Sequence, residues 1–273
     1  MKKGSTYTLV FLLSILIVLL TLTLFMGIKD KNFGRKKVSL QLSESYELAS
    51  INNINIETKS ADIYFKKSDD EKVYVDIYAA EGEKVLSTVE DKKLNIELKT
   101  KTNFCFFCVG NGYQRRIEIK LPESFDGKIN INTKSGDVEM GSYTDAKLNL
   151  SARSGDVTIK EIKTADINLT SGDIEISKIK TANIKATSGD IKLGKVNKMV
   201  DIKVTSGDIR INNFVINADS IIKATSGDIR IKKLSDAFVE TSVKSGDVHV
   251  NGSNRNAQYE LSIKVTSGDI RVN

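Results

Sequence analysis

Apolar and polar residues alternate with a period of two through most of the chain after residue 50. Around a recurring Ser-Gly-Asp tripeptide, apolar residues stand three and five positions before the glycine and two and four positions after it. In the copy centred on Gly207, these positions hold Val204, Ile202, Ile209 and Ile211. Such alternation predicts a β-strand on each side of the turn, with one face of each strand buried.

The tripeptide occurs eight times, at intervals of 17 to 22 residues. A degenerate copy, Ser60-Ala61-Asp62, comes earlier in the chain. We expect each glycine to adopt a positive φ at a corner, while the serine and aspartate hydrogen-bond the bent backbone. The structural glycines predicted in this way are Gly136, Gly155, Gly172, Gly189, Gly207, Gly227, Gly246 and Gly268.

Two repeat architectures satisfy this pattern. In a single-stranded, β-helix-like solenoid, each copy is one rung and equivalent residues stack about 4.8 Å apart in parallel ladders. In an antiparallel meander, each Gly-Asp pair is a two-residue hairpin turn. Near-constant repeat length and matching residue types at each position favour the all-β solenoid. The meander stays open as the alternative.

The alternating pattern has an apolar segment ahead of it. Residues 1–6 form a short flank, residues 7–28 contain no charge, and residues 29–37 form a basic linker. About 20 apolar residues span a bilayer as a helix, and no small-residue cleavage motif ends the run. We therefore expect one N-terminal transmembrane anchor in the lipid bilayer. Behind it, residues 38–125 form an irregular β-rich part of the solenoid and residues 126–273 form the regular repeats.

The orientation of this anchor is less clearly encoded, because basic residues flank it on both sides. Lys2 and Lys3 precede the run, and Lys29, Lys31 and Arg35 are among those that follow it. The positive-inside rule by itself favours a cytoplasmic C-terminus. Short Lys-Lys-apolar N-termini, however, usually act as signal anchors that export the rest of the chain. We expect a single-pass protein of the cell membrane with an extracytoplasmic repeat domain.

The repeats resemble a known bacterial family. The segment Ile117–Pro122, the run Ile129–Val138 ending in Ser-Gly-Asp-Val, and the recurring Thr-Ser-Gly-Asp-Ile are similar to the putative-adhesin β-strand repeat family. That family has no established function and includes LiaG-like membrane proteins of cell-envelope stress operons in Gram-positive bacteria. The resemblance covers roughly residues 50–273. It implies a β-solenoid at the cell envelope, and it supplies no catalytic residues.

The aspartate after each glycine is a candidate metal ligand. Stacked carboxylates bind Ca²⁺ in some solenoids, and the calcium candidates here are Asp173, Asp190, Asp208 and Asp228. Ca²⁺ requires six to eight oxygen ligands, whereas each turn contributes a single carboxylate. A turn-capping role, balanced by nearby basic residues, is therefore the favoured interpretation. No cofactor is expected.

Basic residues occupy outward positions on both strands of the repeat. They include Lys185, Lys203, Lys223 and Lys264 before the turn and Lys192, Arg210, Arg230 and Arg271 after it. These rows could bind an anionic cell-wall polymer, although acids lie among them and a solvated face is the simpler interpretation. The net charge is only +6 and no aromatic residues separate the basic ones, which argues against nucleic-acid binding.

Cys105 and Cys108 are the only cysteines and His249 is the only histidine. A zinc site needs four ligands and a thioredoxin-like motif needs a βαβ setting, so neither interpretation fits. In an exported domain the two cysteines are candidates for a local disulfide. The alternative of two reduced thiols stays open.

These residues contain no nucleophile motif, no phosphate-binding loop and no cluster of acids and bases. We therefore expect a non-enzymatic envelope protein that presents a rigid solenoid for adhesion, scaffolding or envelope-stress signalling, with an envelope protein as a possible partner. The alternatives are a module that binds calcium or an anionic wall polymer, and a self-associating solenoid. The last alternative rests on the C-terminal repeat, Thr266–Asn273, which we expect to leave its edge uncovered.

Overall fold

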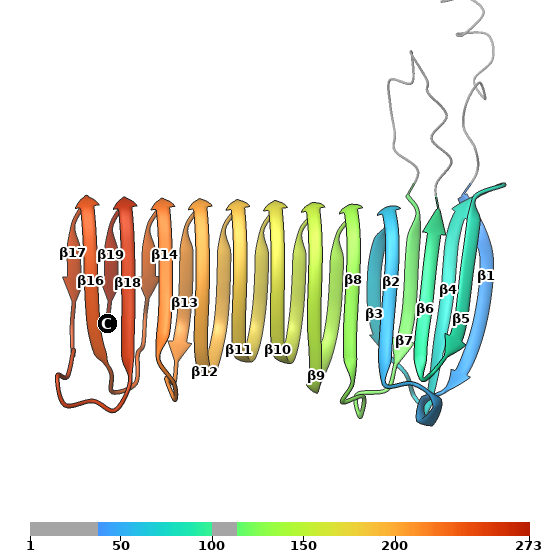
Figure 1. Ribbon diagram of the computed structural model, residues 1–273, viewed down its shortest axis with the longest axis horizontal. Helices are drawn as coiled ribbons and strands as arrows, with labels where there is room; N and C mark the ends of the chain where they lie inside the picture. The colour runs from blue at the N-terminus through green and yellow to red at the C-terminus, as the bar shows by residue number, and fades with distance from the viewer. Residues whose placement is uncertain (1–37, 100–113) are drawn as a thin grey trace, which may run out of the picture. The chain divides into compact units, whose positions relative to one another are not determined.

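The computed structural model describes residues 38–99 and 114–273. They form a β-solenoid with two layers of strands (Figure 1). In the repeats, the chain passes from one layer to the other at each Ser-Gly-Asp corner. The expected membrane segment at residues 7–28 and the two cysteines lie outside the described residues. Within the described ranges, no helix is long and apolar enough to cross a membrane.

The first layer contains the strands that lead into the Ser-Gly-Asp corners. In spatial order it begins with β5 (Lys84–Glu90), β6 (Lys93–Lys99), β2 (Asn53–Ser60) and β8 (Lys128–Ser135). It continues with the C-terminal halves of β9 (Val138–Ser154), β10 (Val157–Ser171), β11 (Ile174–Ser188) and β12 (Ile191–Ser206). It ends with β14 (Ser220–Ser226), β18 (Glu260–Ser267) and β16 (Phe238–Ser245).

The second layer contains the strands that leave the corners. It runs through β1 (Val38–Glu47), β4 (Lys72–Ala80), β7 (Arg116–Leu121) and β3 (Asp62–Lys67), and then through the N-terminal halves of β9 to β12. It ends with β13 (Ile209–Phe214), β15 (Ile229–Ile231), β19 (Ile270–Val272) and β17 (Val248–Val250). A single-turn 3₁₀ helix, η1 (Leu48–Ser50), links β1 to β2.

Parallel pairing of equivalent residues shows that the repeats stack as a solenoid and not as a meander. Ile184 pairs with Ile167 on one side and Ile202 on the other, and the same column continues through Ile222 and Ile263. All five isoleucines are fully buried. The inward residues of both layers therefore fill one continuous core, as the period-two alternation requires.

The order of rungs in space differs from their order in the chain. The last rung in the chain, β18–β19, lies between the β14–β15 rung and the β16–β17 rung. The expectation that Thr266–Asn273 leaves its edge uncovered is therefore wrong. Val272, for example, is fully buried. The edge at this end belongs instead to β16 and β17.

The other end of the solenoid also departs from chain order. The β2–β3 rung lies between the β6–β7 rung and the β8–β9 rung. Beyond β6 and β7, the strands β5, β4 and β1 add antiparallel pairs. Of these pairs, only β5 and β6 are joined by a short turn, at Asp91 and Lys92.

Candidate functional site

The eight predicted glycines all lie at the corners between the two layers. Their φ angles range from +123° to +140°, a region that only glycine occupies readily. A Cβ atom at any of them would overlap the carbonyl group of the residue at the same corner of the neighbouring rung. At Gly207, for instance, it would meet the carbonyl oxygen of Gly189. Glycine is therefore required both by the backbone conformation and by the close stacking.

The aspartates after these glycines form one continuous hydrogen-bonded ladder. The backbone N–H of each Asp donates to the carboxylate of the Asp in the adjacent rung, as from Asp208 to Asp190 at 2.9 Å and from Asp228 to Asp208 at 2.9 Å. The ladder extends from Asp62 to Asp247, with every step between 2.8 and 3.0 Å. Each carboxylate thus accepts a hydrogen bond from a backbone N–H group that, because of the sharp corner, has no carbonyl partner in the neighbouring strand.

The four calcium candidates belong to this ladder, and one oxygen of each already accepts an amide hydrogen bond. The second oxygens of Asp208 and Asp228 face Arg210 and Arg230, at 2.6 and 2.9 Å. Among the described residues, no three His, Cys, Asp or Glu side chains group as a metal site would require. Calcium binding by these aspartates stays a prediction, which the geometry disfavours.

The pKa of one ladder member reflects these contacts. The amide of Asp269, together with the nearby guanidinium of Arg230, lowers the pKa of Asp228 below its ordinary value of 3.8, against a smaller opposing effect of burial. The hydrogen bond and the ion pair both favour the ionised form of this carboxyl group.

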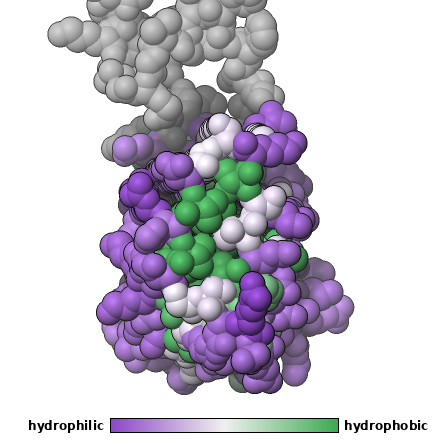
Figure 2. Space-filling model, turned by 90° about the vertical axis from the view of Figure 1, so that its left-hand side faces the viewer, coloured by the Kyte–Doolittle hydropathy of each residue, from purple (hydrophilic) through white to green (hydrophobic). Residues whose placement is uncertain are grey.

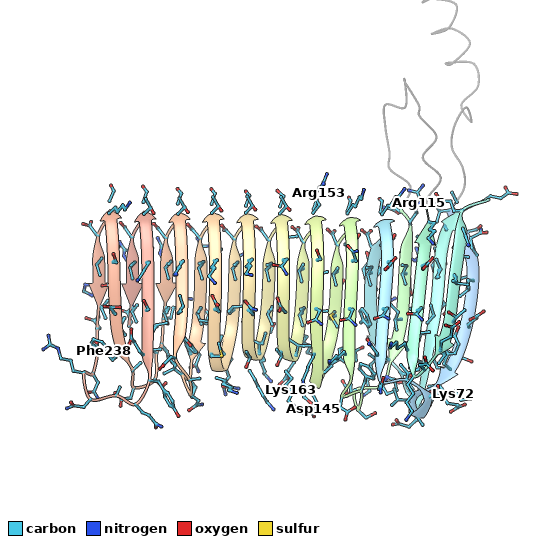
Figure 3. The ribbon with its side chains drawn as sticks, in the orientation of Figure 1. Lys72, Arg115, Asp145, Arg153, Lys163 and Phe238 are labelled. Atoms are coloured by element: carbon cyan, nitrogen blue, oxygen red, sulfur yellow. The ribbon has the colours of Figure 1, made fainter. Side chains whose placement is uncertain are left out.

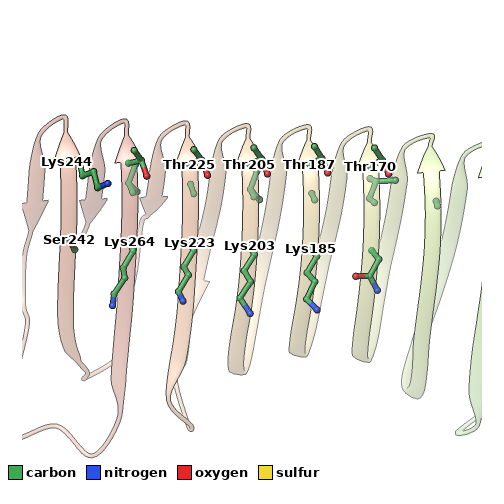
Figure 4. A pocket seen from close by; sticks show the side chains of 18 of the residues that line it. Thr170, Lys185, Thr187, Lys203, Thr205, Lys223, Thr225, Ser242, Lys244 and Lys264 are labelled. Carbon is green, nitrogen blue, oxygen red and sulfur yellow. The ribbon is translucent and has the colours of Figure 1, made fainter.

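A groove of about 810 Å³ lies on the outer face of the first layer, next to the corners. Two rows of outward side chains border it, as Figure 4 shows. One row contains the predicted lysines Lys185, Lys203, Lys223 and Lys264, with Ser242 at the end. The other, nearer the corners, contains Thr170, Thr187, Thr205, Thr225 and Thr266, with Lys244 at the end. We refer to this feature as the Lys–Thr groove.

The basic residues of the two layers differ in their electrostatic surroundings. In the second layer, Arg210, Arg230 and Arg271 each lie within 3.8 Å of a corner aspartate. In the Lys–Thr groove only Lys203 has an acidic neighbour, Asp201 at 3.2 Å. Within the described part of the chain, Lys185, Lys223 and Lys264 form no ion pair. The arginine row is therefore neutralised by its own rungs, and the lysine row is not.

Charged pairs also occur at the edge opposite the corners. Figure 3 places Arg153 at the corner edge, and Asp145 and Lys163 at the opposite edge, where these two pair at 3.5 Å. The only histidine, His249, is exposed on β17 and lies beside Arg271 of β19.

Two polar rows were not foreseen from the sequence. One is the threonine row of the groove, whose signal was the repeated Thr before Ser-Gly-Asp. The other is an asparagine ladder over a smaller groove of about 500 Å³. There Asn149 donates to Asn130, Asn130 to Asn55, and Asn55 to Asn95, at 2.8 to 2.9 Å. Its signal was an asparagine between two Ile or Leu residues, which recurs at Asn55, Asn95, Asn130 and Asn149.

Comparison with known proteins agrees with the repeat geometry. A family model, Toastrack DUF4097, matches residues 51–273, which is most of the chain. The chain belongs to the Toastrack DUF4097 family. The resemblance to an adhesin-like β-strand repeat family of unknown function is thereby confirmed. None of the curated proteins compared with the chain matches it.

Two crystal structures have a fold similar to that of this chain. One is a putative adhesin from Bacteroides fragilis, 21% identical, with a TM-score of 0.52 over 88% of this chain and 98% of the other. The second is a putative adhesin from Parabacteroides distasonis, 15% identical, with a TM-score of 0.51 over 87% and 98% of the two chains. At these identities the likeness shows the fold alone. The Lys–Thr groove of this Toastrack domain must be interpreted from its own residues.

Proposed function

We propose that this protein is a non-enzymatic component of the cell envelope. In this proposal, residues 7–28 anchor it in the membrane and the solenoid serves in adhesion, scaffolding or envelope-stress signalling. The family membership supports the proposal, as does the name "putative adhesin" given to the two crystal structures. The uncharged apolar run at residues 7–28 supports the anchor.

The observation that carries the binding role is the Lys–Thr groove. It crosses successive rungs held rigidly by backbone ladders, the glycine corners and the aspartate ladder. Its lysines and threonines can hold a ligand by charge and hydrogen bonds, while its lining includes no acid, histidine or cysteine to transfer protons or attack a substrate. This composition suits a surface that binds.

Protease treatment of intact protoplasts tests the topology. With the solenoid extracytoplasmic, added protease degrades it, while a cytoplasmic marker protein survives. Complete protection of the solenoid, with full degradation after the membrane is permeabilised, would show that the orientation is wrong.

Site-specific photo-crosslinking in cells tests the binding role. A photoreactive residue at Thr205, in the groove, is expected to capture an envelope component. The same residue at Lys192, exposed on the second layer, is the matched control. Equal capture from both positions, or capture from neither, would contradict a binding face at the groove.

A specific observation favours self-association as a second candidate function. Within the described residues, β16 and β17 each pair on one side only. Val248 is 46% exposed, and Val243 and Val250 are partly buried. Figure 2 looks onto this end and shows apolar residues at its centre with hydrophilic residues around them. An unpaired edge with an apolar centre is a template for another strand.

The occupant that fits this edge is a second copy of the chain. In an antiparallel pair of β16 strands centred on Ser242, Glu240 of one copy lies opposite Lys244 of the other. A two-fold axis produces this contact twice, and both sheets continue across the junction. Sedimentation of the protein over a range of concentrations measures the association.

A further inference from the structure

The Lys–Thr groove has features that point to a class of ligand. We propose that it binds a linear polyanion with hydroxyl groups between its anionic groups, laid along the solenoid axis across successive rungs. The proposal rests on the proposed function, because it assigns the ligand class of the same binding face.

The first argument is the excess of positive charge in the groove. Every charged residue that lines it is basic: Lys185, Lys203, Lys223, Lys264 and Lys244. Like charges directly opposite each other in a sheet are destabilising. The arginines of the second layer avoid this cost by pairing with the corner aspartates, and Lys185, Lys223 and Lys264 do not. A bound polyanion supplies the missing counter-charges.

The second argument is periodicity. Parallel strands place equivalent residues about 4.8 Å apart, so the four stacked lysines extend over about 14 Å. A chain lying along the axis meets another ammonium group at each rung, and the contacts add within one molecule. The long, flexible lysine stems tolerate a repeat that does not match the rung spacing.

The third argument is the composition of the groove beside the lysines. The threonines are exposed, and in the described part of the chain their hydroxyl groups form no hydrogen bonds with other residues. Between the two rows lies the backbone of residues such as Ala186, Val204 and Ala224, whose short side chains point into the core. A hydroxylated polymer can hydrogen-bond the threonines while it lies along the strip between the two rows.

The shape of the site favours a polymer over a bilayer surface. The groove is hollowed between two rows on one layer (Figure 4), so a narrow chain can lie between the lysine and threonine side chains. A flat array of lipid headgroups would reach the tips of the lysines but not the threonine hydroxyls. Anionic vesicles therefore serve as the contrasting probe.

The test uses the full chain in detergent micelles, titrated with fluorescent poly(glycerol phosphate). The groove variant K185Q/K223Q/K264Q is compared with K192Q/K232Q/K233Q, which removes the same charge from exposed positions outside the groove. The groove variant is expected to bind at least about tenfold more weakly. The slope of the logarithm of its binding constant against the logarithm of the salt concentration is expected to decrease in magnitude by about one per lysine removed. The control variant is expected to retain most of the affinity. Circular dichroism melts verify that both variants fold.

A second pair of probes examines the threonines. T205V/T225V is expected to weaken binding of poly(glycerol phosphate) but not of inorganic polyphosphate, which has no hydroxyl groups between its anionic groups. Equal losses for both lysine triples, binding of phosphatidylglycerol vesicles without binding of the polymer, or no binding of either would overturn the proposal. If groove crosslinks still form in cells in those cases, the binding role survives and only the ligand class is wrong.

Discussion

The corner glycines determine how closely the rungs can stack. Gly207→Ala is expected to lower the free energy of unfolding by about 3 kcal/mol or more, because it adds backbone strain to an overlap with the carbonyl of Gly189. Gly82→Ala is the matched control, since Gly82 has φ of +78° but nothing within 4 Å of an added Cβ. It should cost about 1 kcal/mol. Denaturant unfolding measures both, and equal losses would show that stacking adds nothing to the glycine requirement.

The aspartate ladder makes a prediction that depends on position along the stack. Asp208→Ala leaves the amide of Asp228 without its acceptor and should cost about 1 to 3 kcal/mol. Asp247→Ala is the control, because Asp247 lies in the end rung and its carboxylate accepts no hydrogen bond from the described residues. Its expected cost is within about 0.5 kcal/mol. Thermal melts of both variants decide, and equal shifts would contradict the ladder as a source of stability.

Acid should weaken the ladder through Asp228. Its pKa is lowered in the folded state, so its stabilising contribution is complete above the ordinary value of 3.8 and is lost as the pH falls through the lower folded pKa. Urea midpoints measured from neutral pH down to about pH 2 should therefore fall less steeply for Asp228→Asn than for the wild type. The asparagine oxygen still accepts the Asp269 amide. Identical slopes would exclude a contribution from this carboxylate.

At the scale of the strand, adjacent residues face opposite sides of the sheet, one toward the core and one toward solvent. On β14, Ile222 is fully buried in the isoleucine column, whereas its neighbour Ile221 is 38% exposed. Ile222→Ala should cost about 2 to 5 kcal/mol because it leaves a cavity between two stacked rungs. Ile221→Ala should stay within about 1 kcal/mol. Equilibrium unfolding of this matched pair checks the assignment of faces, and a reversed order would mean that the register of β14 is wrong.

Surface rows also differ between the two layers. The arginines of the second layer form ion pairs with the corner aspartates, whereas the lysines of the first layer are separated from these acids by the corner itself. The sequence shows both rows at regular spacing. It does not show which row is neutralised, because that depends on the direction in which the corner carboxylates point.

At the scale of the whole molecule, the exposed end leads to a test by charge exchange. If two β16 strands pair around Ser242, Lys244→Glu places like charges opposite each other twice and should abolish the dimer. The double exchange E240K/K244E restores opposite charges and should restore dimerisation. Sedimentation velocity distinguishes these states. A wild type that stays monomeric at every concentration, or forms open-ended polymers, would exclude the two-fold dimer.

The positions of the corners and of the inward-facing residues can be predicted from short sequence patterns. Ser-Gly-Asp marks the corners because only glycine adopts the required φ there, and alternation assigns the inward columns because strand side chains have a period of two. These rules operate within a few residues. Matching residue types favour stacking of the rungs, and the parallel pairing in the structure decides for a solenoid against a meander.

Only the tertiary structure decided which rungs lie next to each other at the ends. The segments 238–250 and 260–272 share one pattern, so either could stack on β14–β15. The inner rung contains Leu261, Ile263 and Val265, whereas the end rung has Val239, Thr241 and Val243 at the matching positions. Larger apolar side chains gain more from burial on both sides, and a threonine costs less at an end that faces water. That choice depends on comparing distant segments, which no local pattern encodes.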